Sequence, residues 1–251
     1  MRYDPMVFDR KTVFMQRIAD QVRRGYRHYT IGEVSIERAK PLAMKFARLY
    51  GVHLHRNQKA RERAYGQASA CVLWWHPHTD TVVFCLLLTP GPHAARSLES
   101  LRDSHARDTR LTLDEFELVL HSRPECGRPA WTWRLTQEAY EAWRFRTLEV
   151  CRFGNPYEVT QFVDFLNATP GFAGVRGQVK KVKALFRAEW KRRRPNGSTC
   201  VTIGTRQRYL QRLSNSGARL STLTKQVHLS STSKSSYGRR GGSLTKLSGS
   251  N

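Results

Sequence analysis

The chain has 251 residues, of which 43 are Lys or Arg and 20 are Asp or Glu, so its formal charge is +23. Hydrophobic residues make up 39% of the chain, enough for a core, which excludes a wholly disordered chain and a collagen-like one. No run of 18 apolar residues occurs, so we expect no membrane-spanning helix and no membrane partner. The first residues also lack the apolar segment of a secretory signal, and we expect a cytoplasmic protein with reduced thiols.

The positive charge is unevenly distributed along the chain. Residues 176–251 carry 18 Lys and Arg but a single acidic residue, Glu189, whereas residues 1–175 carry 25 basic and 19 acidic residues. The composition also changes at Pro195, beyond which Ser, Gly, Lys and Arg dominate. We therefore expect a globular domain over residues 1–195 and a basic, largely disordered tail over residues 196–251.

Helical and extended patterns alternate in the first half of the chain. Apolar periodicity predicts a helix over residues 7–24, and a short extended segment separates it from a second helix over residues 37–50. The apolar segments ASACVLWW and TVVFCLLLT flank a HPHTD turn and predict a hairpin over residues 69–89. Because both segments are apolar throughout, we expect helices to cover this hairpin on both faces.

The second half of the chain begins with a short helix, HAARSLESLRD, and a second hairpin. LDEFELVLHSRP and PAWTWRLT predict the hairpin strands, and apolar periodicity then predicts helices over residues 136–154, 155–169 and 178–194. This order of elements predicts an α+β fold. We expect an antiparallel sheet of about four strands, formed by the two hairpins and packed against helices.

The helix over residues 178–194 is the main candidate for binding phosphates. Val179, Val182, Phe186 and Trp190 recur at helical spacing and are expected to face the core. The rest of the helix is expected to present a ridge of cations: Lys180, Lys181, Lys183, Arg187, Lys191, Arg192, Arg193 and Arg194. Such a ridge suits nucleic acid, because each neutralised phosphate releases condensed counterions. A solvated surface helix and a basic helix on a membrane surface are the alternatives.

Two further basic segments extend this candidate interface. Arg56, Lys59, Arg61 and Arg63 lie close together in a helix-prone segment. Arg239 and Arg240 belong to an RGG motif in the acid-free tail, and flexible tails of this kind can wrap polyanions. The alternative for the tail is that it only keeps the protein in solution.

Histidine, cysteine and tryptophan residues raise two further possibilities, a zinc site and a base-stacking surface. Cys71, His76, His78 and Cys85 surround the first hairpin turn, but their spacing matches no usual zinc finger, and we expect neither a metal nor another cofactor. A base-stacking surface could be formed by four tryptophans, Trp74, Trp75, Trp131 and Trp133. Core packing is the favoured role for them, because aromatic side chains dominate protein cores. The phosphate-loop, dinucleotide, serine-hydrolase and zinc-protease signatures GxxxxGK[ST], GxGxxG, GxSxG and HExxH do not occur.

Several segments resemble known families. His53-Leu54-His55 resembles the His-hydrophobe-His motif of HUH replication and relaxase endonucleases, which implies a metal-binding pair on a strand; an exposed pair after a helix is the alternative.

VFDRKTVFMQRIAD, RPAWTWRLT and TPGFAGVRGQVKK resemble accessory proteins of proteobacterial plasmids and integrating elements, over most of residues 3–194. This implies a role in replication, transfer or defence of a mobile element. TPGFAGVRG and GRRGG are similar to the glycine-rich loop of CRISPR guide-processing ribonucleases.

Taken together, the sequence predicts a nucleic-acid-binding protein of a plasmid or other mobile element, without enzymatic activity. It would contact the phosphates of DNA or RNA through the basic helix and the tail, alongside other proteins of the element. Two alternatives stay open. One is a metal-independent RNA endonuclease that processes CRISPR-type guide RNA, and the other is a structural adaptor that binds an acidic protein partner.

Overall fold

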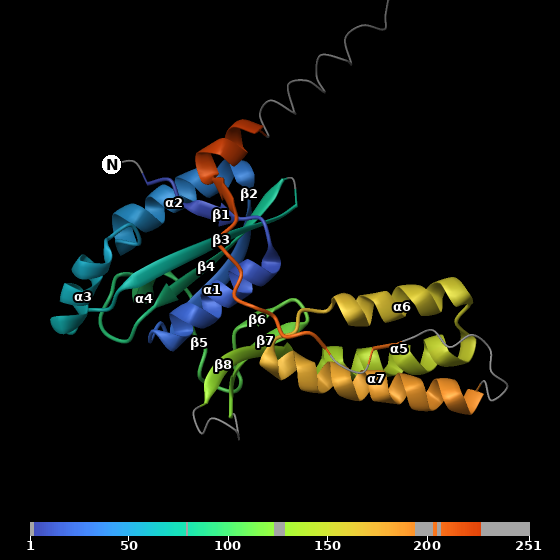
Figure 1. Cartoon of the computed structure of the whole chain (residues 1–251). Coiled ribbons are helices and arrows are strands. Elements are labelled where there is room, and N and C mark those ends of the chain that lie inside the picture. The colour runs from blue at the N-terminus through green and yellow to red at the C-terminus, as the bar shows by residue number, and fades with distance from the viewer. Residues whose placement is uncertain (1–2, 79, 123–128, 194–202, 205–206, 227–251) are drawn as a thin grey trace, which may run out of the picture.

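The computed structural model describes residues 3–78, 80–122, 129–193, 203–204 and 207–226 (Figure 1). Its helices are α1 (Lys11–Arg23), α2 (Ile36–Tyr50), α3 (Arg56–Ala64), α4 (Ala95–Leu98), α5 (Gln137–Phe153), α6 (Pro156–Ala168) and α7 (Ala173–Arg193). Its strands are β1 (Met6–Phe8), β2 (His28–Ser35), β3 (Ala70–His78), β4 (Thr81–Leu88), β5 (Arg102–Asp103), β6 (Thr112–Leu113), β7 (Phe116–His121), β8 (Ala130–Leu135) and β9 (Gly217–Arg219). The fold mixes helices and strands, as expected, but the strands form two sheets.

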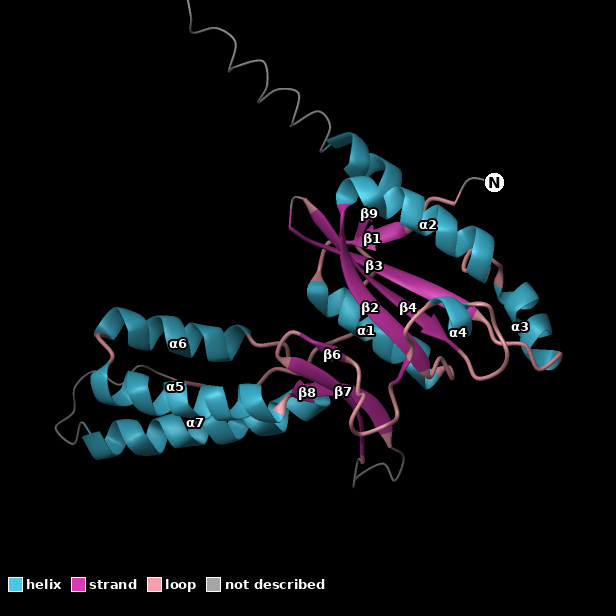
Figure 2. Cartoon of the chain, turned by 180° about the vertical axis from the view of Figure 1, so that it is seen from behind, coloured by secondary structure: helices cyan, strands magenta, loops and turns pink. Residues whose placement is uncertain are grey.

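The first sheet is built around the hairpin of β3 and β4, and both of its faces are covered. Along β4, successive side chains alternate between two cores. Val83, Cys85 and Leu87 pack with α1, whereas Val82, Leu86 and Leu88 pack with α2. The two helices therefore lie on opposite sides of the sheet (Figure 2). This confirms the expectation drawn from the uninterrupted apolar run in each strand.

The sheets differ from the single antiparallel sheet of about four strands that the sequence predicted. The first sheet has six strands in the order β5-β2-β4-β3-β1-β9, and the second has three in the order β6-β7-β8. Residues 7 and 8, expected in a helix, belong to β1, which pairs parallel with β3 through Val7 and Trp74. The second hairpin does not join the first sheet; α1 packs against both β3 and β8, and Trp133 Nε1 of β8 donates to Met15 O at 2.9 Å.

Helices α5, α6 and α7 form a helical arm that extends from the second sheet (Figure 1). The Asn155 side chain accepts from Glu158 N, which caps the start of α6, and Thr136 caps α5 in the same way. Helix α7 begins at Ala173, five residues earlier than expected. Gln178 joins it to β8 by two hydrogen bonds with the backbone of Leu135, at 2.8 and 3.1 Å. The arm thus shares one continuous core with the second sheet and α1.

Residues 207–226, which we call the strap, return across α1 to the first sheet. Within it, β9 pairs antiparallel with β1, and a helical segment begins at Leu220, whose side chain is 1% exposed. Gly217 in β9 has a φ of +149°, and a Cβ atom there would lie 2.0 Å from Val7 O. Only glycine allows this close pairing. These residues were expected in the disordered tail, but they belong to the folded body.

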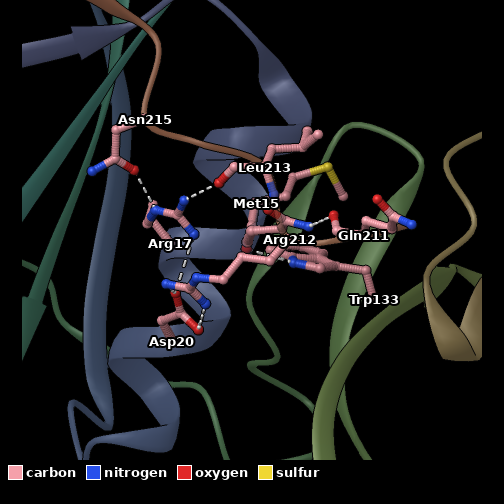
Figure 3. A network of polar contacts seen from close by, with 9 residues as sticks. Met15, Arg17, Asp20, Trp133, Gln211, Arg212, Leu213 and Asn215 are labelled. Carbon is pink, nitrogen blue, oxygen red and sulfur yellow. Dashed lines mark hydrogen bonds and ion pairs between the residues drawn. The ribbon is translucent and has the colours of Figure 1, made fainter. Parts of the chain in front are cut away.

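Polar contacts hold the strap against α1 (Figure 3). Arg17 donates to Asn215 Oδ1 at 2.6 Å and to Leu213 O at 2.5 Å. Arg212 donates to both carboxylate oxygens of Asp20, at 3.1 and 2.8 Å. Arg212, a basic residue of the C-terminal third, therefore serves the fold, and its charge is already paired.

Candidate nucleic-acid interface

The inner face of α7 is apolar, as the sequence predicted. Val179, Val182, Phe186 and Trp190 are at most 7% exposed, and the rings of Phe186 and Trp190 stack with their centroids 5.6 Å apart. Phe186 also stacks on Phe162 of α6. This stripe fixes the rotation of α7 in the helical arm, and with it the side chains that reach solvent.

Lys183 does not belong to the cationic ridge, so that part of the prediction is wrong. Its side chain is 1% exposed, and Nζ donates to Asn167 Oδ1 at 2.8 Å and to Gln207 Oε1 at 2.9 Å. The reason is the helical period. Residue 183 lies four positions after Val179, on the edge of the buried stripe. Burial lowers the pKa of Lys183, and the nearby positive charge of Arg187 acts in the same direction.

Glu189 neutralises part of the charge at the end of α7. Its side chain is 3% exposed and accepts from Arg152 Nε at 3.0 Å, from Arg193 Nε at 3.4 Å, and from Arg192. The hydrogen bond from Arg152 is the main cause that lowers the pKa of Glu189 to about 2, and those from Arg192 and Arg193 add to it. Arg192 and Arg193 are exposed, as predicted, but they already have an anionic partner.

The outer face of α7 is where unpaired cations remain. It consists of Lys180, Lys181, Ala184, Ala188 and Lys191, all exposed. These three lysines form no hydrogen bond or ion pair with any part of the chain that the structure describes. The alanine side chains between them are small, so a ligand can approach the helix backbone closely there. Arg187 is only half exposed, and Arg194, Arg239 and Arg240 lie outside the described residues.

Helix α3 carries the second predicted group of cations, and the structure adds a member to it. Arg56, Lys59 and Arg63 line a cavity of about 560 Å³ together with Arg24, which follows the last residue of α1. Arg61, on the same helix, is exposed and does not line the cavity. Sequence reasoning missed Arg24 because 31 residues separate it from Arg56. We call this space the α3 cavity.

The two groups of cations lie far apart. Helix α3 is at one end of the molecule and the helical arm with α7 is at the other (Figure 1), an arrangement that the reverse view repeats (Figure 2). The structure therefore separates the predicted interface into two distinct surfaces.

The tryptophans do not form a shared stacking platform. Trp74 and Trp133 are fully buried. Trp75 stacks on Phe14, and Trp131 stacks on His105 with the ring centroids 4.7 Å apart. Core packing, the role favoured from the sequence, is what the structure shows.

The histidine pair His53 and His55 lies in the loop between α2 and α3, so the strand implied by the HUH resemblance is absent there. His55 is the residue before α3, and the His53 ring packs edge-on against Tyr3. Among the residues that the structure describes, no group of three or more His, Cys, Asp or Glu side chains is arranged to hold a metal ion.

No protein-family model matches the chain, and no curated protein or solved structure matches it either. None of the helices within the described ranges combines the length and hydrophobicity needed to cross a bilayer. A functional proposal for this protein therefore rests on the geometry of its two basic surfaces.

Proposed function

We propose that the protein binds nucleic acid through phosphate contacts made by the outer face of α7. The observation that carries this proposal is the set of exposed lysines at positions 180, 181 and 191, which have no anionic partner in the described part of the chain. A solvated helix usually mixes both signs of charge. Here the only acidic residue of the helix, Glu189, is buried and occupied by arginines.

The dimensions of this face suit a polynucleotide backbone. Lys180 and Lys191 are eleven residues apart, which corresponds to about 16 Å along a helix axis. That length equals about five steps of a nucleic-acid strand, at about 3.4 Å per phosphate along the axis. Lysines at both ends, with alanines between them, allow the backbone to approach closely. Phosphates carry no base information, so this face supports binding to many sequences.

The test is a triple variant, Lys180→Gln, Lys181→Gln and Lys191→Gln, measured against a control of equal charge. Three exposed cations of α2 supply that control: Arg38→Gln, Lys40→Gln and Arg48→Gln. Affinity for double-stranded DNA and for RNA is measured at several salt concentrations. The α7 variant should weaken binding to all sequences and reduce the magnitude of the slope of log affinity against log salt by about 2–3.

Both variants should keep the melting temperature of the parent, since the changed side chains are exposed and glutamine favours helix. The α2 control should retain most of the affinity and most of the slope. The proposal fails if the folded α7 variant has the parental slope, or if the two variants weaken binding equally.

A further inference from the structure

The α3 cavity lies between the end of α1 and the start of α3, on the surface remote from α7. Tyr26 and Cys71 also line it, and we call this uncharged part of its lining the floor; Tyr26 is only 6% exposed. Burial raises the pKa of Tyr26 to about 12, so its ring and hydroxyl are neutral at physiological pH. The floor is thus uncharged, while Arg24 and three cations of α3 line the same cavity.

The charges around this cavity are unbalanced. Arg24, Arg56, Lys59 and Arg63 line it, and no carboxylate does so in the described structure. Elsewhere, exposed arginines find carboxylates, as Arg27 does with Asp103 at 2.6 Å. The four cavity cations have no such ion pair with any described residue. Like charges placed together repel one another, and a bound anion would relieve that repulsion.

Two of these cations are held in place by backbone oxygens. Lys59 Nζ donates to Val52 O at 3.0 Å, and Arg63 Nε donates to Lys59 O at 3.2 Å. Burial lowers the pKa of Lys59, and the charge of Arg63 adds to this effect, although Glu62 opposes it. The contacts hold the cations near the cavity while leaving further N–H groups of both side chains for a ligand.

The cavity is larger than a single small anion requires. Its volume of about 560 Å³ falls within the range of sites for small organic ligands. A second cavity of about 290 Å³ shares Arg24 and Arg63 with it, so these two arginines stand between two adjoining spaces. A ligand that matches this surface has several negative charges at one end and an uncharged, partly apolar body at the other.

We propose that the α3 cavity is a binding site for a nucleoside phosphate, either a free nucleotide or the terminal nucleotide of a strand. The phosphates lie among the four cations, and the nucleoside occupies the uncharged floor. Arginine forks and a lysine ammonium are suitable donors for phosphate oxygens. This site is independent of the outer face of α7 and stands whether or not that face binds nucleic acid.

Calorimetric titration with ATP tests the proposal, with adenosine and inorganic phosphate as partial ligands. The variant Arg24→Gln with Arg56→Gln removes two cavity cations. The matched control, Arg23→Gln with Arg61→Gln, removes two exposed cations from the same helices without touching the cavity. The cavity variant should bind ATP about tenfold more weakly or worse, since hydrogen bonds to charged groups are lost. The control should stay within about twofold.

The proposal is overturned if the parent protein shows no ATP binding at low salt, or if the two double variants lose affinity equally while both remain folded by circular dichroism. It is also overturned if the α7 triple variant loses ATP binding to the same extent. ATP should bind more tightly than inorganic phosphate, because the nucleoside adds contacts. Equal affinity would contradict the assignment of the floor to the nucleoside.

Competition identifies the source of the nucleotide. Short oligonucleotides with a 5′-phosphate or a 5′-hydroxyl are added to the ATP complex of the α7 triple variant, whose outer face no longer contributes. Preferential displacement by the 5′-phosphorylated strand assigns the site to strand ends. Displacement by free nucleotides alone assigns it to a soluble nucleotide. A lack of nucleic-acid binding by α7 leaves this measurement unaffected, so the two proposals fail separately.

Discussion

Helix α7 presents its unpaired lysines on a convex face, whereas helix α3 contributes its cations to a concave site. On α7, alanines separate Lys180 and Lys191, and an extended polyanion can lie along the helix. At α3, cations from two separate segments, Arg24 and Arg56 among them, line one space of limited volume. A convex row suits a polymer and a concave cluster suits a compact ligand, so the same residue types support different kinds of recognition.

One lysine of each region, Lys183 and Lys59, makes the contrast sharper. Lys183 is buried, and it donates to the side-chain amides of Asn167 and of Gln207, which belongs to the strap. Lys59 is half exposed and has a single backbone partner beside an open cavity. One lysine is therefore part of the scaffold, and the other is positioned for a ligand.

The largest effect is expected from removing the strap. A chain ending at Arg206 loses the buried side chain of Leu220, the contacts of Arg212 with Asp20, and the Gln207 partner of Lys183. Burial of one leucine contributes about 1.5–3 kcal/mol, and the amide left unpaired adds to the loss. We expect urea unfolding to report a stability lower by about 3 kcal/mol or more.

A chain ending at Gln226 is the control, since it keeps the strap and loses only later residues, with their cations. Its unfolding midpoint should match that of the full chain, while its affinity for nucleic acid falls if Arg239 and Arg240 contact phosphates. If the chain ending at Arg206 is as stable as the full chain, the strap is not needed and residues 1–195 suffice for the fold.

The next largest effect on stability is expected at Lys183, and Lys59 is its comparison. Lys183→Met should lower the free energy of unfolding by about 2 kcal/mol, because the oxygens of Asn167 and Gln207 lose a buried charged donor. Lys59→Met should change it by less than about 1 kcal/mol, since Lys59 is half exposed. For ATP affinity the order should reverse, with only Lys59→Met weakening binding. Urea titrations and calorimetry on both variants check this; the same order in both measurements would contradict the comparison.

Much of the local structure could be predicted from the sequence because it follows from short-range periodicity. The two hairpins and helices α2, α5, α6 and α7 have apolar spacings of two or about 3.6 residues that identify them, whereas α3 buries no residue. Strands β1 and β9 could not be predicted in this way. Each has three residues, and they form only because the chain ends of the body meet, with Val7 opposite Ala218. Pairing between residues so distant in sequence leaves no local pattern.

The candidate site was predictable to a similar degree. The buried stripe of α7 follows from its spacing, and Lys180, Lys181 and Lys191 were correctly placed outside it. Lys183 was misplaced because the stripe is wider than four residues, and a lysine was assumed to reach solvent. The α3 cavity could not be predicted from the sequence, since Arg24 and Arg56 are distant in sequence and line one space only in the folded chain.

The smallest effect is expected at Glu189, whose replacement alters charge without removing volume. Its pKa is lowered from an ordinary value of 4.5 to about 2, chiefly by the hydrogen bond from Arg152. A lowered pKa means that the folded state favours the carboxylate. The stabilising contribution of this group is therefore complete above about pH 4.5 and is lost as the pH falls through about 2. Glu189→Gln should unfold more easily at pH 7 and lose that part of the pH dependence.

The same change should strengthen binding to nucleic acid. Without the carboxylate, the exposed Arg192 and Arg193 have no anion to pair with there, and they extend the row that Lys191 begins. Each additional phosphate contact should raise the magnitude of the salt slope by about 0.7–0.9. Glu149→Gln is the matched control. It removes the same charge, and Glu149 forms an exposed ion pair with Arg146 at 3.4 Å. If both glutamine variants gain affinity equally, overall charge rather than the end of α7 governs binding.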